Sequence, residues 1–117
     1  MAQMTVQLPD KLAERCKAIG PWLPTVIELS LSGFKTSAIT TVSEVIELLC
    51  QNPGPNEVSE FHVSEAAQLR LRRLLTLNEG GHLSLTEKAE LDELQHLEHI
   101  VIMLKIRAKK LYCEGNN

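Results

Sequence analysis

The sequence predicts an all-α protein of about five helices, with a short N-terminal strand and a C-terminal antiparallel helical hairpin. Three observations predict it. Apolar residues recur at steps of three and four along most of the chain. Aromatic residues make up only 3% of the 117 residues, against 44% hydrophobic residues, so aliphatic side chains must fill the core, as in packed helices. Residues 84–112 contain no Gly or Pro and read as one helix.

The N-terminal part is predicted to hold one strand and two helices. Residues 3–8 alternate polar and apolar side chains, which indicates a short, half-buried strand; an extended N-terminal arm is the alternative. A helix is predicted over residues 10–19, ended by Gly20 and Pro21. A second helix follows from residue 23 or 24 to residue 31.

Two further short helices are predicted around the segment richest in Pro and Gly. Thr41, three residues before Glu44, matches a capping box at the start of a third helix that ends near residue 50. Ser64 is placed to cap a fourth helix running to about residue 77. The Pro/Gly-dense stretch between them predicts a division of the chain into a lobe over 1–52, a linker over 53–62 and a helical hairpin over 63–113.

The long helix over residues 84–112 carries the strongest local signals. Ser84 and Glu87 form a capping-box pattern, acidic residues crowd the first half, and basic residues crowd the second half. Ile100 to Leu104 are five consecutive apolar residues, which cover the whole circumference of a helix. We therefore expect cover on more than one side, from another chain or from the N-terminal helices of the same chain. The residues predicted at a partner interface are Leu97, Ile100, Val101, Met103, Leu104 and Leu111.

The sequence shows no catalytic signature, and no enzyme activity, cofactor or metal site is predicted. A glycine-rich phosphate loop and a nucleophile elbow are both missing. Glu93 and His96, with His99 one turn further on, match the Glu-x-x-His element of di-iron bundles, but no second element of that kind lies on another predicted helix. Cys16 and Cys50 fall on apolar helix faces and are expected to be inert core residues.

The composition indicates which cellular compartment and which partners to expect. The net charge of −3 gives no overall attraction to nucleic acid, and Arg70 and Arg73 are expected to pair with the acidic half of the long helix. An odd set of three widely spaced cysteines favours a reducing cytoplasm over a disulfide framework. Neither a signal peptide nor a membrane span is visible, so we expect a cytoplasmic protein.

The stretch TVQLPDKLAERCKAIG resembles the ribbon-helix-helix family of DNA-binding proteins. In that family two chains pair their strands, and the ribbon enters the major groove of DNA. The resemblance implies DNA contacts from Gln3, Thr5 and Gln7, with Thr25 at the phosphate. The chain departs from the pattern where the second helix begins, because Pro21–Thr25 replaces the usual small polar residue. The third helix is also extra.

Over nearly its full length the chain resembles a family of small cyanobacterial proteins, some of them labelled antitoxins. The residues that carry this resemblance are LPTVIELSLSGF, VSEVIELL and LNEGGHLSLTEKAELDELQHLEHIVIMLKIRAKKL. It implies an antitoxin-like regulator that forms a homodimer and binds another protein such as a toxin. A structural or assembly adaptor without DNA binding is the alternative. One departure is that the C-terminal half is rich in capped helix, whereas antitoxins commonly present a disordered tail.

Overall fold

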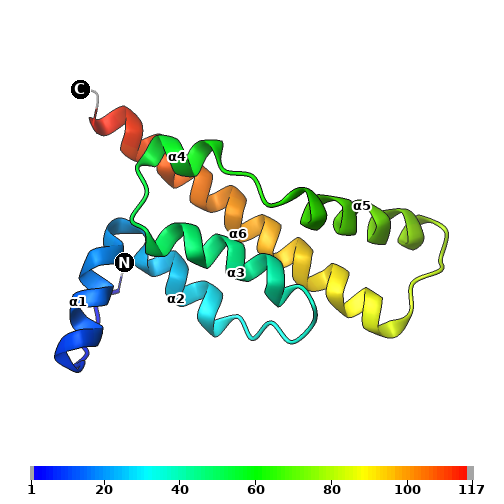
Figure 1. Ribbon diagram of the computed structural model, residues 1–117, viewed down its shortest axis with the longest axis horizontal. Helices are drawn as coiled ribbons and strands as arrows, with labels where there is room; N and C mark the ends of the chain where they lie inside the picture. Colours follow the sequence, from blue (N-terminus) through cyan, green and yellow to red (C-terminus); the bar gives the residue numbers. More distant parts are fainter. Residues whose placement is uncertain (1, 116–117) are drawn as a thin grey trace.

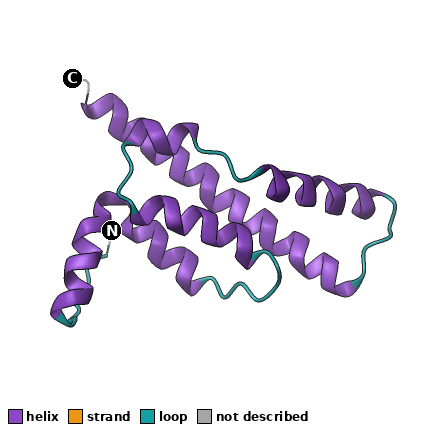
Figure 2. Ribbon diagram, in the orientation of Figure 1, coloured by secondary structure: helices purple, strands orange, loops and turns teal. Residues whose placement is uncertain are grey.

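The computed structural model describes residues 2–115, and over that range it contains helices and no strand (Figure 2). The all-α fold class is therefore confirmed. None of the described helices is long and apolar enough to cross a membrane. In chain order the elements are α1 (Asp10–Ile19), the short 3₁₀ helix η1 (Gly20–Trp22), α2 (Leu23–Leu31), α3 (Ile39–Cys50), α4 (Pro55–Glu60), α5 (Glu65–Glu79) and α6 (Leu85–Gly115).

Helix α6 runs the length of the molecule, and α2, α4 and α5 contact it directly (Figure 1). Its 31 residues give a length of about 46 Å at 1.5 Å per residue, close to the 47 Å longest extent of the molecule. The predicted capping box is present at its start. Ser84 Oγ accepts the N–H of Glu87, and the Glu87 carboxylate accepts the N–H of Ser84, each at 3.1 Å.

The larger core cluster joins α2, α3 and α4 to the second half of α6. Trp22 at its centre is fully buried, and its Nε1–H donates a 2.7 Å hydrogen bond to the buried carbonyl of Pro53. This bond satisfies the one polar group of the indole, which lets the whole ring lie in the core. The buried members of the cluster are Trp22, Leu29, Val42, Val45, Leu49, Val58, Leu97, Ile100, Leu104 and Ala108.

A smaller core cluster lies under α5, which packs against the first half of α6. It contains Ala38, Leu74, Leu91 and Leu94. Leu74 is the only residue of α5 that is buried. Helix α3, by comparison, buries Val42, Val45 and Leu49.

The segment 53–62, predicted as a linker, instead contains helix α4. Val58 is 1% exposed and belongs to the larger core cluster, and Pro53 is also buried. Pro55 opens the helix because the first turn needs no N–H donor from that residue. A single cluster thus includes residues from both sides of the predicted boundary.

The predicted strand over residues 3–8 is absent from the described chain. Residues 2–9 form no regular secondary structure, and all of their side chains are exposed. The physical reason is that a strand needs a neighbouring strand for its N–H and C=O groups, and residues 2–115 provide none. The segment is an arm without regular secondary structure that leads into α1.

The predicted capping box of Thr41 and Glu44 is wrong, whereas the predicted cap at Ser64 is confirmed. Helix α3 begins at Ile39, before Thr41. The Glu44 carboxylate instead accepts bonds from the backbone N–H and the Oγ–H of Ser64, at 2.6 and 2.8 Å. Ser64 Oγ in turn accepts the N–H of Ala67 at 3.2 Å. Glu44 therefore ties the middle of α3 to the start of α5.

Candidate protein-interaction surfaces

The N-terminal arm exposes apolar side chains that nothing in the described chain covers. Met4 is 86% exposed and Val6 is 59% exposed. The polar residues that alternate with them, Gln3, Thr5 and Gln7, are exposed as well. Apolar and polar residues alternate along the arm, and both kinds of side chain are open to solvent. The predicted DNA contacts of the arm are thus accessible.

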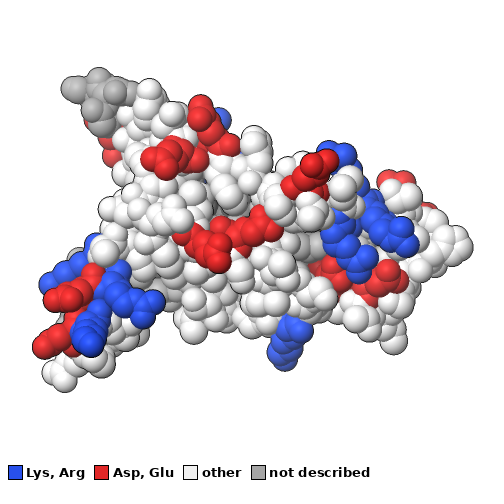
Figure 3. All heavy atoms as spheres, viewed as in Figure 1, with Lys and Arg blue, Asp and Glu red and all other residues white. Residues whose placement is uncertain are grey.

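Helix α1 follows the arm and projects from the body, and its main contacts are with η1 and α3 (Figure 1). It has an amphipathic pattern but no buried residue. Leu12 is 40% exposed, and the cysteine on the same face, Cys16, is half-buried. Figure 3 shows Lys and Arg side chains mixed with Asp and Glu on this projecting helix, so its polar face carries both signs of charge.

The turn after α1 holds the helix in its projecting position. Gly20 has a φ of 71°, a left-handed conformation that glycine adopts without steric strain. Its N–H caps α1 through the carbonyl of Lys17, as predicted from the Gly-Pro stop. Thr25, the predicted phosphate contact, lies in the first turn of α2 and is half-buried. The structure therefore separates Thr25 from the arm by the whole of α1.

The six predicted interface residues of α6 do not share one environment. Leu97, Ile100 and Leu104 are each 3% exposed and belong to the core of the chain. Val101 and Leu111 are partly buried against the same cluster. Met103 alone is exposed, at 53%. Half of the predicted surface is thus internal core.

Helix α6 has an exposed apolar surface on a different face from its buried predicted interface residues. We call it the outer patch and define it as Ile102, Met103 and Ile106, which are 49%, 53% and 50% exposed. Ile102 is absent from the six predicted interface residues although it lies in the unbroken apolar run, and Ile106, which follows that run, is absent as well. The signal that could have found it is the step of four from Ile102 to Ile106, which places both on one face.

A cavity of about 330 Å³ opens between the two core clusters. Its walls come from α5, α6 and the segment that joins α4 to α5, and most of their lining is apolar. Leu71, Leu97 and Val101 line its floor, and the polar side chains of Gln68, Glu98 and Lys105 are also at its surface. Its volume falls at the lower end of the range for small-ligand pockets. The hydroxyl of Thr41, the imidazole of His62 and the side chain of Ile102 also line it.

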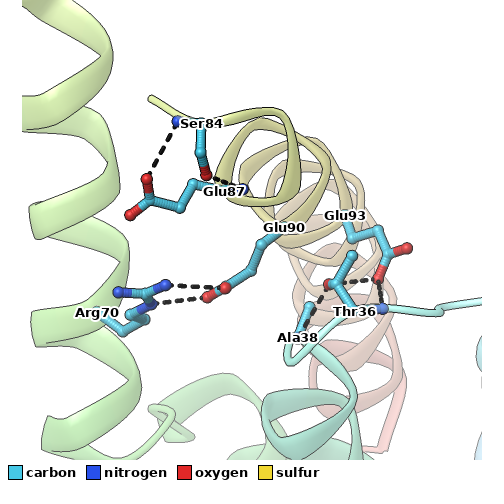
Figure 4. A network of polar contacts seen from close by, with 7 residues as sticks. All are labelled: Thr36, Ala38, Arg70, Ser84, Glu87, Glu90 and Glu93. Atoms are coloured by element: carbon cyan, nitrogen blue, oxygen red, sulfur yellow. Dashed lines mark hydrogen bonds and ion pairs between the residues drawn. The ribbon is translucent and has the colours of Figure 1, made fainter. Parts of the chain in front are cut away.

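Two polar contacts fix the first half of α6 to its neighbours, and a third caps its first turn (Figure 4). Arg70 donates to both carboxylate oxygens of Glu90 at 2.8 and 3.0 Å, which confirms the predicted pairing for that arginine. The hydrogen bond to Glu90 raises the pKa of Arg70 above its ordinary value. The Ser84 N–H, by its bond to the carboxylate of Glu87, lowers the pKa of Glu87.

Glu93 hydrogen-bonds to the loop that precedes α3. Its carboxylate accepts the backbone N–H groups of Lys35 and Thr36 and the Oγ1–H of Thr36, at distances of 2.8 to 3.1 Å. Burial alone would raise the pKa of Glu93, but these hydrogen bonds outweigh it and hold the pKa below its ordinary value. The ring of His96 lies 5.8 Å from that of Phe34. The two residues of the Glu-x-x-His element therefore have separate structural contacts.

The cysteines are placed differently from the prediction. Cys50 is exposed, not in the core, because it lies at the last position of α3, beyond Leu49. Cys16 is half-buried and Cys113 is exposed. All three are free thiols in the described chain.

Comparison with known proteins adds no relative: no family model, no curated protein and no solved structure matches this chain.

Proposed function

We propose that this chain is a non-enzymatic protein-interaction module, an antitoxin-like regulator that acts as a homodimer and binds a second, different protein. One observation carries the proposal. The arm and α1 form a continuous N-terminal segment with exposed apolar side chains and no buried residue in α1. Isolated helices of this length are marginal in water. An amphipathic helix with an uncovered apolar face gains its missing packing when another chain covers it.

The second protein covers the apolar side chains of this segment. Met4, Val6 and Leu8 are exposed apolar residues of the arm, and Leu12 follows on α1. In an antitoxin-like system the second protein is the toxin, and its gene lies beside that of the regulator. The N-terminal segment is then the part that covers the toxin, in place of the capped C-terminal half.

The experiment expresses the product of the neighbouring gene alone and together with this chain. We expect growth arrest by that product and relief by the wild-type chain. A Val6→Asp/Leu12→Asp variant should fail to relieve the arrest, because a charge on the contact surface must be desolvated. Ile39→Asp is the matched control, since Ile39 is 48% exposed on α3, outside the N-terminal segment. A neighbouring product that leaves growth unchanged, or relief by all three proteins, contradicts the proposal.

The regulator also binds its operator through the polar side chains of the arm. Gln3, Thr5 and Gln7 are exposed side chains of the types that hydrogen-bond to base edges, and Thr25 is the remaining proposed contact. A mobility-shift assay with its own promoter, across a salt series, tests this part. Affinity should rise as salt falls, and Gln3→Ala/Gln7→Ala should lower it.

A structural or assembly adaptor without DNA binding is the second candidate. It is favoured by the charge of the N-terminal segment: residues 2–9 contain no Lys or Arg, and α1 carries both signs of charge. Phosphate neutralisation normally uses several cations. Absence of any shift with the promoter at low salt would establish the adaptor and exclude the operator-binding part.

A further inference from the structure

The outer patch of α6 lies in the middle of a regular exposed stripe. Going along the helix, Gln95, His99, Ile102, Ile106 and Lys109 follow one another in steps of four, three, four and three residues. All five are exposed. This spacing keeps side chains on one face of a helix and is the spacing by which two helices pack along a seam. The opposite face of α6 holds Leu97, Ile100, Leu104 and Ala108 of the larger core cluster.

The charges beside this stripe change sign along the helix. Before the patch, Asp92 and Glu98 are exposed acids; Lys105 lies between Met103 and Ile106, and Lys109 and Lys110 follow the patch. Between His99 and Cys113 there is no Asp or Glu at all. The ion pair found within residues 2–115 joins Arg70 to Glu90, so these cations have no carboxylate partner in that range.

We propose that a second copy of this chain docks antiparallel on the stripe, with the two-fold axis close to Ile102. Asp92 lies about 15 Å before Ile102 along the helix, and Lys110 about 12 Å after it. Asp92 and Lys110 are about five full turns apart, so they lie on the same side of α6. An antiparallel second copy therefore brings each Asp92 beside the Lys110 of the other copy.

The two-fold symmetry also brings together the charged residues on the other side of the stripe, and charge repulsion excludes a parallel arrangement. Glu98 and Lys105 lie at similar distances on either side of the axis, so they also meet in the antiparallel arrangement. A parallel arrangement would place acid beside acid and lysine beside lysine, which is repulsive. The two-fold contact is isologous, so it closes after two copies.

The apolar centre of this contact is small. Three half-exposed side chains from each copy, with His99 and Gln95 beside them, bury less surface than a standard stable interface. The dimer is accordingly one that dissociates on dilution. This dimer is the homodimer of the proposed function, on which the inference rests, and the stripe on α6 is the surface that forms it.

The first experiment measures the mass of the full chain by sedimentation over a dilution series, with reductant present because Cys50 and Cys113 are exposed. We expect a dimer that dissociates on dilution. Ile102→Asp should be monomeric at concentrations where the wild type is a dimer. Leu85→Asp, at an 89% exposed position at the start of the same helix, should leave the mass unchanged. Circular dichroism checks that both variants remain helical.

The second experiment fixes the orientation by exchanging charges. Asp92→Lys and Lys110→Asp should each weaken dimerisation, because each places like charges together twice in the symmetric dimer. The double variant Asp92→Lys/Lys110→Asp should restore dimerisation, since the ion pairs re-form with exchanged signs. Failure of the double variant to recover what the single variants lose overturns the antiparallel arrangement.

The outcomes separate this inference from the proposed function. A wild-type chain that stays monomeric at every concentration overturns both the docking surface and the homodimer. A dimer that tolerates Ile102→Asp but dissociates with Val6→Asp keeps the homodimer and overturns the α6 surface, because self-association then uses the N-terminal arm.

Discussion

Leu104 and Met103 are neighbours on α6 whose replacement by alanine should have very different effects on stability. Leu104 is 3% exposed within the larger core cluster, whereas Met103 is 53% exposed. Leu→Ala at a buried site combines lost transfer free energy with a cavity, and about 3 kcal/mol is the expected loss here. Full burial of a methionine contributes about 1.5–3 kcal/mol, so half of it gives about 1 kcal/mol at Met103. Better helix propensity of alanine reduces the second loss further.

Urea unfolding followed by the fluorescence of Trp22 measures both changes. Trp22 is the single tryptophan and is fully buried in the cluster that contains Leu104, so its emission reports the unfolding of that core. Leu104→Ala should also lower Tm by about 12 °C in a domain of this size. The measurement is made at low protein concentration, where self-association does not contribute. Equal losses in the two variants, or a larger loss for Met103→Ala, would refute the assignment of faces on α6.

Three further changes test the polar contacts. Ser64→Ala removes the cap of α5 and one bond to Glu44, and should lower the free energy of unfolding by about 1 kcal/mol in a urea titration. The pKa of Glu93 in the folded chain lies below its ordinary 4.5, so its contribution to the free energy of unfolding is complete above pH 4.5 and is lost as the pH falls through the folded pKa. Glu93→Gln should therefore flatten the dependence of stability on pH below pH 4.5. An unchanged dependence would contradict this. Trp22→Phe leaves the buried Pro53 carbonyl without its donor and should cost roughly 2–4 kcal/mol by thermal melting followed with circular dichroism.

Features set by local sequence were predictable. Ser64 and Ser84 both cap the helices for which they were assigned, because a capping bond joins residues only three positions apart. Gly20 ends α1 as expected, because only its own backbone conformation is involved. The pairing of Arg70 with the acidic half of α6 also followed, since α5 and α6 are consecutive helices joined by a short turn.

Features set by contacts between distant segments were not predictable. Glu44 was assigned to its own helix but bonds to Ser64, 20 residues further on. Glu93 bonds to Lys35 and Thr36 across 58 and 57 residues. In both cases the carboxylate could satisfy either a local or a distant N–H, and only the packing of α3 against its neighbours decides between them.

Helix α4 was missed because its stability comes from the core and not from its own sequence. It has 6 residues, and an isolated helix of that length does not form in water. Its Pro and Gly neighbours favoured a linker. What holds it is Val58, which is 1% exposed against α6, and the nearby bond from Trp22 to Pro53. A burial pattern of one residue in six leaves no periodic signal to detect.

The run from Ile100 to Leu104 shows why the candidate interface could be located only in part. Five consecutive apolar residues point in every direction around a helix, so they indicate cover on several sides without saying which residue meets which neighbour. The structure divides the run: Ile100 and Leu104 lie in the core, and Ile102 and Met103 stay half-exposed. Core burial therefore accounts for the face that carries Ile100 and Leu104. We now expect an interface on the face that carries Ile102 and Met103. Ile100→Asp should unfold the chain, whereas Ile102→Asp should leave a folded chain of lower mass, because only the first charge would be buried inside the monomer.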